Sequence, residues 1–239
     1  MLTKNQIKFI KGLSLKKNRI EHQCFIVEGE KSVLELLVSD FEIIYLYAID
    51  SFFRENNCVE TTLITNNELA QISSLKSPNK VLAVVKMPQV IYSKRKGLTL
   101  VLDSINDPGN LGTIIRLCDW FGVQQIICSK DTVDMYNPKV VQASMCSLFR
   151  INLVYTSLVE YLKEVETPIY GTFLDGSIIK DIDKLPEDVH LILGNESNGI
   201  SEEVTSLVTN RVAVKNIGLK TESLNVSMAT AIFLHEFCA

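Results

Sequence analysis

Short apolar runs alternate with segments of helical periodicity through the C-terminal part of the chain, and this alternation strongly limits the folds open to it. The runs at 99–102 and 189–193 are almost entirely apolar, as expected for strands of a parallel sheet that is buried on both faces. The pattern predicts strands at 98–104, 124–128, 151–155, 168–173, 189–194 and 211–214, and helices at 110–121, 137–146, 157–164, 201–208 and 224–237. We therefore expect an open α/β layer whose ligand lies beyond the carboxyl ends of the strands.

The N-terminal part of the chain predicts a second, smaller α/β domain. Strand-like segments lie at 42–49, 61–65 and 80–86, with a helix at 66–73. A polar, basic stretch follows Met87 and ends at Gly97; it is either a linker or a solvated loop. The predicted organisation is a domain at 1–88, a linker at 89–97 and a second domain at 98–239.

Positive charge is concentrated at the N-terminus, although the whole chain has a net charge of −4. The first twenty residues contain no acid and carry these basic side chains: Lys4, Lys8, Lys11, Lys16, Lys17 and Arg19. The net charge excludes a whole-protein field that attracts polyanions. The cluster itself has two interpretations, a solvated helix face or a local contact with nucleic acid.

Cysteine and histidine spacing argues against a metal site. The six cysteines include no CxxC pair, and the three histidines are isolated from one another. We expect the cysteines to be small buried residues in a reducing compartment. The longest apolar run, 43–49, is far shorter than the roughly 20 residues that span a bilayer, and the first dozen residues do not resemble a secretory signal. These features predict a soluble, cytoplasmic protein.

Two polar loops follow predicted strands in the C-terminal domain. The first contains an Asp-Pro-Gly turn, with Asn110 placed to cap the next helix. Arg116 points away from the apolar face of that helix, either toward a ligand or into a surface pair with Asp119. The second loop brackets Glu196 with glycines and asparagines over 194–199. Its glycines favour close approach to a ligand, although an ordinary turn with Ser201 as the helix N-cap also fits.

A third polar loop, 220–227, precedes the last predicted helix and contains Ser223 and Asn225. Neither a Walker A sequence nor a GxGxxG sequence occurs in the chain, which disfavours nucleoside triphosphate and dinucleotide sites. Singly, this loop is an N-terminal helix cap. Together, the three loops place polar side chains at one edge of the predicted sheet.

The three loops resemble the three motifs of the SpoU/TrmH family of SPOUT RNA methyltransferases. The matching segments are Asn110-Leu111-Gly112 with Arg116, Gly194-Asn195-Glu196 with Gly199-Ile200-Ser201, and Glu222-Ser223-Leu224-Asn225-Val226-Ser227. The N-terminal stretch, with Lys16-Lys17 and the segment 25–31, is similar to the family's substrate-binding domain. The resemblance thus covers nearly the whole chain.

The resemblance implies a C-terminal domain with a trefoil knot and a homodimer formed through that domain. It implies S-adenosyl-L-methionine as the cofactor and methylation of a ribose 2′-hydroxyl in tRNA or rRNA as the reaction. One feature departs from the family pattern: segment 211–215 lacks the proline of the usual Ile-Pro-Met-like triplet, and the loop after it is longer. Two alternatives are a non-catalytic RNA-binding or assembly protein and a methyltransferase of a small molecule or protein.

The family roles carry over to matching positions. The catalytic residues implied are Arg116, Asn110, Glu196, Ser223 and Asn225. The cofactor-binding residues implied are Leu193, Gly194, Val212, Val214 and Leu224. RNA contact is expected from Lys16, Lys17 and Arg19. Since an arginine stays charged, Arg116 is expected to clamp a phosphate, while Glu196 is either the base or the partner of Arg116 in an ion pair.

Overall fold

The computed structural model describes residues 1–56, 60–89, 96–182, 184–218, 220 and 222–238. The chain forms two compact units: unit 1 comprises Met1–Gln89 and Asp134–Phe149, and unit 2 comprises Val90–Val133 and Arg150–Ala239. The segment Asp134–Phe149 is thus part of unit 1, although the sequence placed it in the predicted C-terminal domain. Most of the predicted linker at 89–97 lies outside the described residues, and 1–88 and 98–239 stay predictions as domain boundaries.

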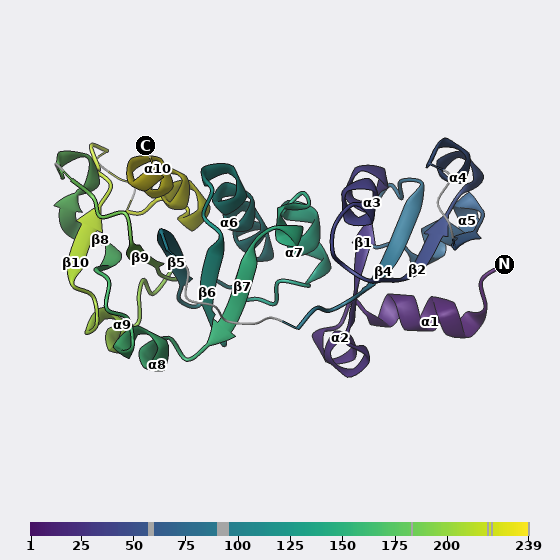
Figure 1. Cartoon of the computed structure of the whole chain (residues 1–239), viewed down its shortest axis with the longest axis horizontal. Helices are drawn as coiled ribbons and strands as arrows, with labels where there is room; N and C mark the ends of the chain where they lie inside the picture. The colour runs from purple at the N-terminus through teal and green to yellow at the C-terminus, as the bar shows by residue number, and fades with distance from the viewer. Residues whose placement is uncertain (57–59, 90–95, 183, 219, 221, 239) are drawn as a thin grey trace. The chain divides into compact units, whose positions relative to one another are not determined.

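Unit 1 is a small α/β unit, as the sequence predicts. Its elements are α1 (Lys4–Gly12), α2 (Lys16–His22), β1 (Cys24–Glu28), α3 (Glu30–Leu37), β2 (Ile43–Ala48), α4 (Asp50–Asn56), β3 (Thr61–Leu63), α5 (Asn66–Ile72), β4 (Val81–Lys86), α7 (Pro138–Ala143) and η1 (Ser147–Phe149). The strand order is β1-β4-β2-β3. Helices α1 and α5 pack on one face of this sheet, and α3 contacts β1 and β4 (Figure 1).

Local sequence signals explain where the helices of unit 1 begin. Thr3 and Thr65 each form a capping box with the residue three positions later, at the start of α1 and α5. The segment 134–149 joins this unit through nonlocal packing. The ring of Tyr136 lies 4.5 Å from the ring of Phe25 in β1, so the segment completes the apolar surroundings of that strand.

Unit 2 contains a six-stranded sheet with helices on its faces. Its elements are β5 (Leu98–Leu102), α6 (Pro108–Phe121), β6 (Gln125–Ser129), β7 (Asn152–Thr156), α8 (Leu158–Lys163), β8 (Ile169–Ile178), η2 (Ile179–Asp181), β9 (Val189–Leu193), α9 (Glu202–Thr205), β10 (Asn210–Ala213) and α10 (Val226–Cys238). Helix α6 packs against α10, and α8 packs against α9, with the two pairs on opposite sides of the sheet (Figure 1).

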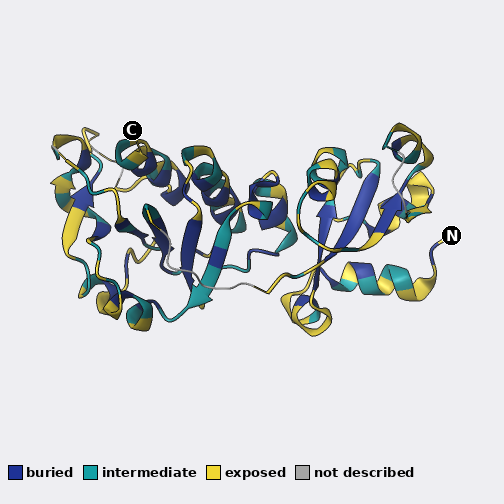
Figure 2. Cartoon of the chain, viewed as in Figure 1, coloured by how far each residue is buried: buried dark blue, intermediate teal, exposed yellow. Residues whose placement is uncertain are grey.

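The sheet of unit 2 has the order β10-β8-β9-β5-β6-β7, and its described pairings are parallel. Its central strands are buried, whereas the outer helix faces are exposed (Figure 2). The predicted parallel α/β layer is confirmed, and the trefoil knot stays a prediction. The strand order reverses between β5 and β9. At such a switch point the loops leaving neighbouring strands diverge and create a ligand crevice.

Candidate active site

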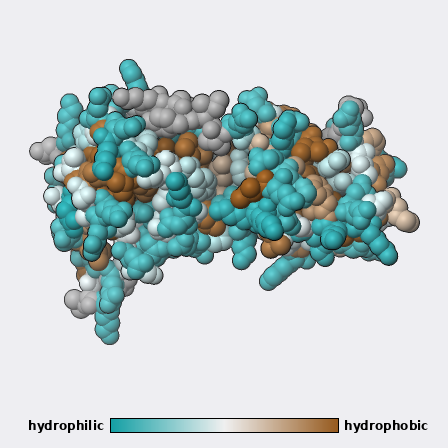
Figure 3. All heavy atoms as spheres, turned by 90° about the horizontal axis from the view of Figure 1, so that it is seen from below, coloured by the Kyte–Doolittle hydropathy of each residue, from teal (hydrophilic) through white to brown (hydrophobic). Residues whose placement is uncertain are grey.

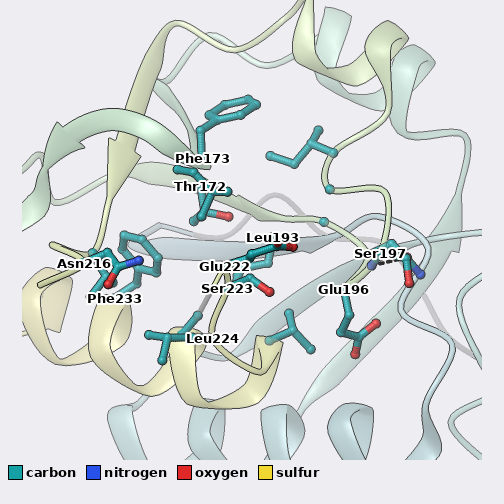
Figure 4. Close-up of a pocket in the computed structure, with 18 of the residues that line it drawn as sticks. Thr172, Phe173, Leu193, Glu196, Ser197, Asn216, Glu222, Ser223, Leu224 and Phe233 are labelled. Carbon is teal, nitrogen blue, oxygen red and sulfur yellow. Dashed lines mark hydrogen bonds between the residues drawn. The ribbon is translucent and has the colours of Figure 1, made fainter. Parts of the chain in front are cut away.

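A cavity of about 770 Å³ lies in unit 2, at the carboxyl ends of β9 and β10 and beside the middle of β8. The segments that line it are 172–174, 193–200, 214–218 and 222–224, together with residues of α10. Leu193, Glu222 and Ser223 lie at its centre in Figure 4, with Glu196 to one side. The second and third polar loops predicted from the sequence therefore meet at one cavity.

The loop after β9 is closed by its own backbone. Asn195 and Gly199 exchange backbone hydrogen bonds of 2.9 and 2.8 Å, and Gly199 has a φ of +70°. A Cβ atom at Gly194 would lie 2.1 Å from the carbonyl carbon of Gly199. These glycines thus permit close approach between the two sides of the loop, and both line the cavity, so close approach of a ligand stays a prediction.

One chain of hydrogen bonds joins the three polar loops. The Asn110 side-chain amide donates to Glu196 Oε1, and Asn225 Nδ2 donates to Asn110 Oδ1 at 3.0 Å. Asn225 is itself held, because its Oδ1 accepts from the backbone N–H and the hydroxyl of Ser227. Three side chains that are far apart in the sequence therefore lie in one network beside the cavity.

The capping prediction for Asn110 is wrong. The N-cap of α6 is Asp107, whose Oδ1 accepts from the Asn110 backbone N–H at 2.9 Å, and Pro108 occupies the first helical position. Proline lacks an N–H group and has a φ suited to this position, so the Asp-Pro pair starts the helix. The Asn110 side chain is thereby left to join Glu196 and Asn225.

Arg116 lies on the exposed side of α6, six residues after Asn110, or about 9 Å along the helix axis. The surface pair considered for it is absent: Asp119 pairs instead with Arg150, with Nη2 and Oδ2 2.7 Å apart. Arg116 forms no ion pair with Glu196 or with any other residue that the structure describes. Its guanidinium is therefore available to a ligand.

The other predicted site residues fall into two groups. Leu193, Gly194, Val214, Leu224, Glu196 and Ser223 line the cavity. Val212 lies outside the described lining and is buried in β10. Its backbone packs closely against Gly176: a Cβ atom added at Gly176 would lie 2.5 Å from the carbonyl carbon of Val212. Asn110, Asn225 and Arg116 also lie outside this lining. Hydrogen bonds connect the first two to Glu196.

A buried carboxylate that the sequence analysis did not single out holds the glycine-bracketed loop in place. Asp103, at the end of β5, is 4% exposed, and its Oδ2 accepts from the backbone N–H and the hydroxyl of Ser201, both at 2.8 Å. At the other end of the loop, Asn195 Nδ2 donates to the Ser104 carbonyl at 2.8 Å. Both ends of the loop are thereby tied to the segment after β5.

The middle of β8 forms a further wall of the cavity that the sequence did not predict. Thr172 and Phe173 line it, and the Arg211 guanidinium lies 3.5 Å from the centre of the Phe173 ring. Arg211 also pairs with Asp175, and this hydrogen bond lowers the pKa of the Asp175 carboxyl. The expectation that ligands bind at the carboxyl ends of parallel strands could have identified this segment.

The three basic residues expected to contact RNA differ in placement. Lys16 and Lys17 are exposed in the first turn of α2. Arg19 is 1% exposed; its Nη2 lies 2.6 Å from Asp134 Oδ2, and its Nη1 donates to the carbonyls of Leu13 and Ser14. The Arg19 guanidinium is buried, and its hydrogen bonds go to Asp134, Leu13 and Ser14. The structure therefore gives Arg19 a role inside unit 1 instead of RNA contact.

Within the described residues, no group of three or more His, Cys, Asp or Glu side chains could hold a metal ion, and no helix is long and apolar enough to cross a membrane. Cys24, Cys118, Cys128 and Cys146 are buried, and none of them forms a disulfide among the described residues. Burial raises the pKa of the Cys118 and Cys128 thiols, so both stay protonated and unreactive.

Comparison with protein families gives a match to each part of the chain. The model of the SpoU rRNA Methylase family matches residues 97–235. The model of the MRM3-like substrate binding domain matches residues 4–83. The first match contains the three polar loops, the cavity and Arg116.

Individual relatives match along nearly the whole length. The chain is 30% identical to the 23S rRNA (guanosine(2553)-2′-O)-methyltransferase RlmP of Bacillus subtilis, over 97% of this chain and 96% of the relative. A TrmH-family structure from Porphyromonas gingivalis is 37% identical, with a TM-score of 0.91 over 99% and 98% of the two chains. An AdoMet-bound rRNA methyltransferase from Sinorhizobium meliloti is 27% identical, with a TM-score of 0.86 over 99% and 95%.

Proposed function

The chain belongs to the SpoU rRNA methylase family and is an S-adenosyl-L-methionine-dependent RNA 2′-O-methyltransferase, and we propose that its substrate is 23S ribosomal RNA. The RlmP relative, whose name specifies 23S rRNA, aligns along 97% of this chain. The observation that carries a catalytic role is the hydrogen-bonded chain Glu196–Asn110–Asn225 beside the cavity. A non-catalytic RNA-binding protein has no evident need for this arrangement.

The cavity suits S-adenosyl-L-methionine in size and chemistry. Its volume of about 770 Å³ is within the range of small-molecule sites. Glu196 and Glu222 supply carboxylates for a cationic ligand, while Leu193, Leu224 and Phe233 supply apolar surface. We assign the cofactor to this cavity, with Leu193, Gly194, Val214 and Leu224 against it. Val212 supports the wall from within the sheet.

The mechanism depends on holding a ribose hydroxyl in place. When bound, the cofactor supplies a methyl group that is already electrophilic. The chain must then orient the 2′-hydroxyl and stabilise negative charge on its oxygen. We propose that Glu196, whose Oε1 accepts a hydrogen bond from the Asn110 amide, binds the 2′-hydroxyl. We propose that Arg116 binds a neighbouring phosphate. A guanidinium suits this second role because it stays charged and binds phosphate through two parallel hydrogen bonds.

We further propose that the chain forms a homodimer through unit 2. Helices α6 and α10 pack against each other and expose Trp120, Met228 and Ile232, at 83%, 61% and 36%. Met228 and Ile232 are four residues apart and share one face of α10. Exposed apolar side chains on two adjacent helices are typical of an association surface. We also propose a cytoplasmic location, since buried cysteines without disulfides among the described residues suit a reducing compartment.

The experiment that tests the proposal is a map of 2′-O-methyl positions in 23S rRNA and tRNA from cells with and without the gene. We expect one position in 23S rRNA to lose its methyl group and to regain it with the wild-type chain, but not with Arg116→Ala. Loss of a 2′-O-methyl group in tRNA instead would show that tRNA, and not 23S rRNA, is the substrate. An unchanged map, with no binding of S-adenosyl-L-methionine in calorimetry, would favour the non-catalytic alternative.

A further inference from the structure

Three aromatic side chains of unit 1, Phe9, His22 and Tyr45, form what we call the aromatic cluster. The Phe9 ring meets the His22 ring edge to face, with centroids 5.1 Å apart and planes at 76°. It meets the Tyr45 ring in the same way, at 6.5 Å and 85°. The rings come from α1, from the end of α2 and from β2. Tyr45 is 48% exposed, and His22 is also exposed.

The aromatic cluster extends the core of unit 1 beyond the helix that covers it. Tyr45 and Tyr47 are two residues apart on β2 and therefore share one face of the sheet. Tyr47 is 1% exposed, packed in the core with Ile10 of α1. Tyr45 continues that row, with its ring centroid 6.2 Å from that of Tyr47, yet half of it is exposed. An ordered aromatic surface thus faces solvent.

The helices that contribute to the aromatic cluster carry unneutralised positive charge. Their exposed lysines are Lys4, Lys8 and Lys11, at a spacing that places them on one side of α1, and Lys16 and Lys17 at the start of α2. None of the five pairs with a carboxylate that the structure describes, whereas Lys80 pairs with Glu30 and Glu55, and Lys86 with Glu42. On the side seen in Figure 3, hydrophobic atoms of unit 1 appear among hydrophilic ones.

We propose that the aromatic cluster stacks an unpaired nucleotide of the RNA substrate while the lysines of α1 and α2 hold the flanking phosphates. This inference rests on the proposed function, because it takes RNA as the substrate. Lysines attract any phosphate backbone, but aromatic rings stack only on bases whose faces are free. Duplex RNA hides those faces, and an acidic peptide would use the lysines without the rings. The combination therefore favours a single-stranded segment.

The test compares Tyr45→Ala with Tyr45→Phe in the full chain. Fluorescence anisotropy measures binding of a short single-stranded oligoribonucleotide of mixed sequence and of the blunt duplex of the same sequence. We expect Tyr45→Ala to weaken single-strand binding by about 5- to 100-fold and to leave duplex binding unchanged. Tyr45→Phe, which keeps the ring, should bind as the wild type does. Leu37→Ala, on α3 at 39% exposure, is a matched surface control.

The lysines give a second, independent measurement. Lys8→Ala and Lys11→Ala should weaken the binding of both the single strand and the duplex. For the single strand, each lost phosphate contact should reduce the steepness of log affinity against log salt concentration by about 0.7. Unchanged single-strand binding by Tyr45→Ala, or equal loss for the single strand and the duplex, would overturn the stacking role. Circular dichroism and a urea unfolding midpoint equal to that of the wild type confirm that each variant is folded.

The binding measurement involves no methyl transfer. A failed stacking role is therefore distinct from a failed proposed function, which the methylation map would reveal.

Discussion

Arg19 of α2 and Arg116 of α6 show two different uses of positive charge. Arg19 is 1% exposed and is bound to Asp134 and to two carbonyls of unit 1. Arg116 is exposed and has no ion pair among the described residues. A cation whose hydrogen bonds are taken up by the fold stabilises that fold, whereas a cation left without an acid is available to a ligand. Substitution of Arg19 should therefore lower stability, whereas substitution of Arg116 should lower the rate of methyl transfer and leave stability unchanged.

The largest effect on stability is expected at Arg19. Arg19→Ala leaves the Asp134 carboxylate without its partner in a mostly buried place, which costs about 3–5 kcal/mol of the free energy of unfolding. Urea-induced unfolding followed by circular dichroism measures this loss. Arg54→Ala is the control: its pair with Asp50 is 77% and 62% exposed, so its removal should cost less than about 1 kcal/mol. Equal losses would remove the distinction between the two arginine environments.

Substitution of Arg116 should affect the reaction and not the stability. Arg116→Ala is expected to lower the rate of methyl transfer by about 100- to 1000-fold, as for loss of a group that stabilises charge in the transition state. Its urea midpoint and its affinity for S-adenosyl-L-methionine should match those of the wild type. Arg116→Lys should also fail, because lysine keeps the charge but loses the planar fork.

The control for Arg116 is Arg150→Ala, which removes a guanidinium paired with Asp119 of the same helix. It should leave the rate unchanged. A wild-type rate for Arg116→Ala would remove Arg116 from the proposed mechanism, and a large loss of stability would place it with Arg19.

Asp103 adds a third case to the comparison of Arg19 with Arg116. It is buried like Arg19, but its hydrogen bonds hold the loop after β9, which lines the cavity. Asp103→Asn keeps one acceptor oxygen but weakens both bonds to Ser201. We expect the KM for S-adenosyl-L-methionine to rise by about tenfold, the size of one lost charge-assisted hydrogen bond, with a smaller change in kcat. Ser201→Ala removes only the hydroxyl contact and should have a smaller effect. A fall in kcat alone would show that Asp103 does not position the cofactor side of the loop.

The fold of unit 2 could be predicted because its information is local. Apolar runs such as those of β5 and β9 identify buried parallel strands, and the structure confirms them. The placement of residues 134–149 could not be predicted. It depends on contacts such as Tyr136 with Phe25, which no periodicity encodes.

The candidate site shows the same limit. The motif resemblance identified Asn110, Glu196 and Asn225, and the structure joins them. The charge pattern grouped Arg19 with its lysine neighbours, because nothing in the local sequence reveals a partner 115 residues away. Arg116 has no ion pair in the described part of the chain for a similar reason: its helical neighbour Asp119 pairs with Arg150 from another segment. Side-chain availability is thus a property of tertiary structure.

Glu68 extends the comparison to an acid and gives the smallest expected effect. Its carboxylate accepts hydrogen bonds from the backbone N–H groups of Thr65, at 2.9 Å, and Leu2, at 2.6 Å, which lower its pKa from 4.5 to about 2. Because the folded-state pKa lies below the ordinary value, the stabilisation is fully present above 4.5 and is lost as the pH falls toward about 2. Thermal unfolding of Glu68→Gln should show a lower midpoint than the wild type at neutral pH, and the difference should narrow through that range. A constant difference would mean that the bonds to Thr65 and Leu2 do not depend on the charge, so Glu68 would not share the role of Arg19 as a charge held by the fold.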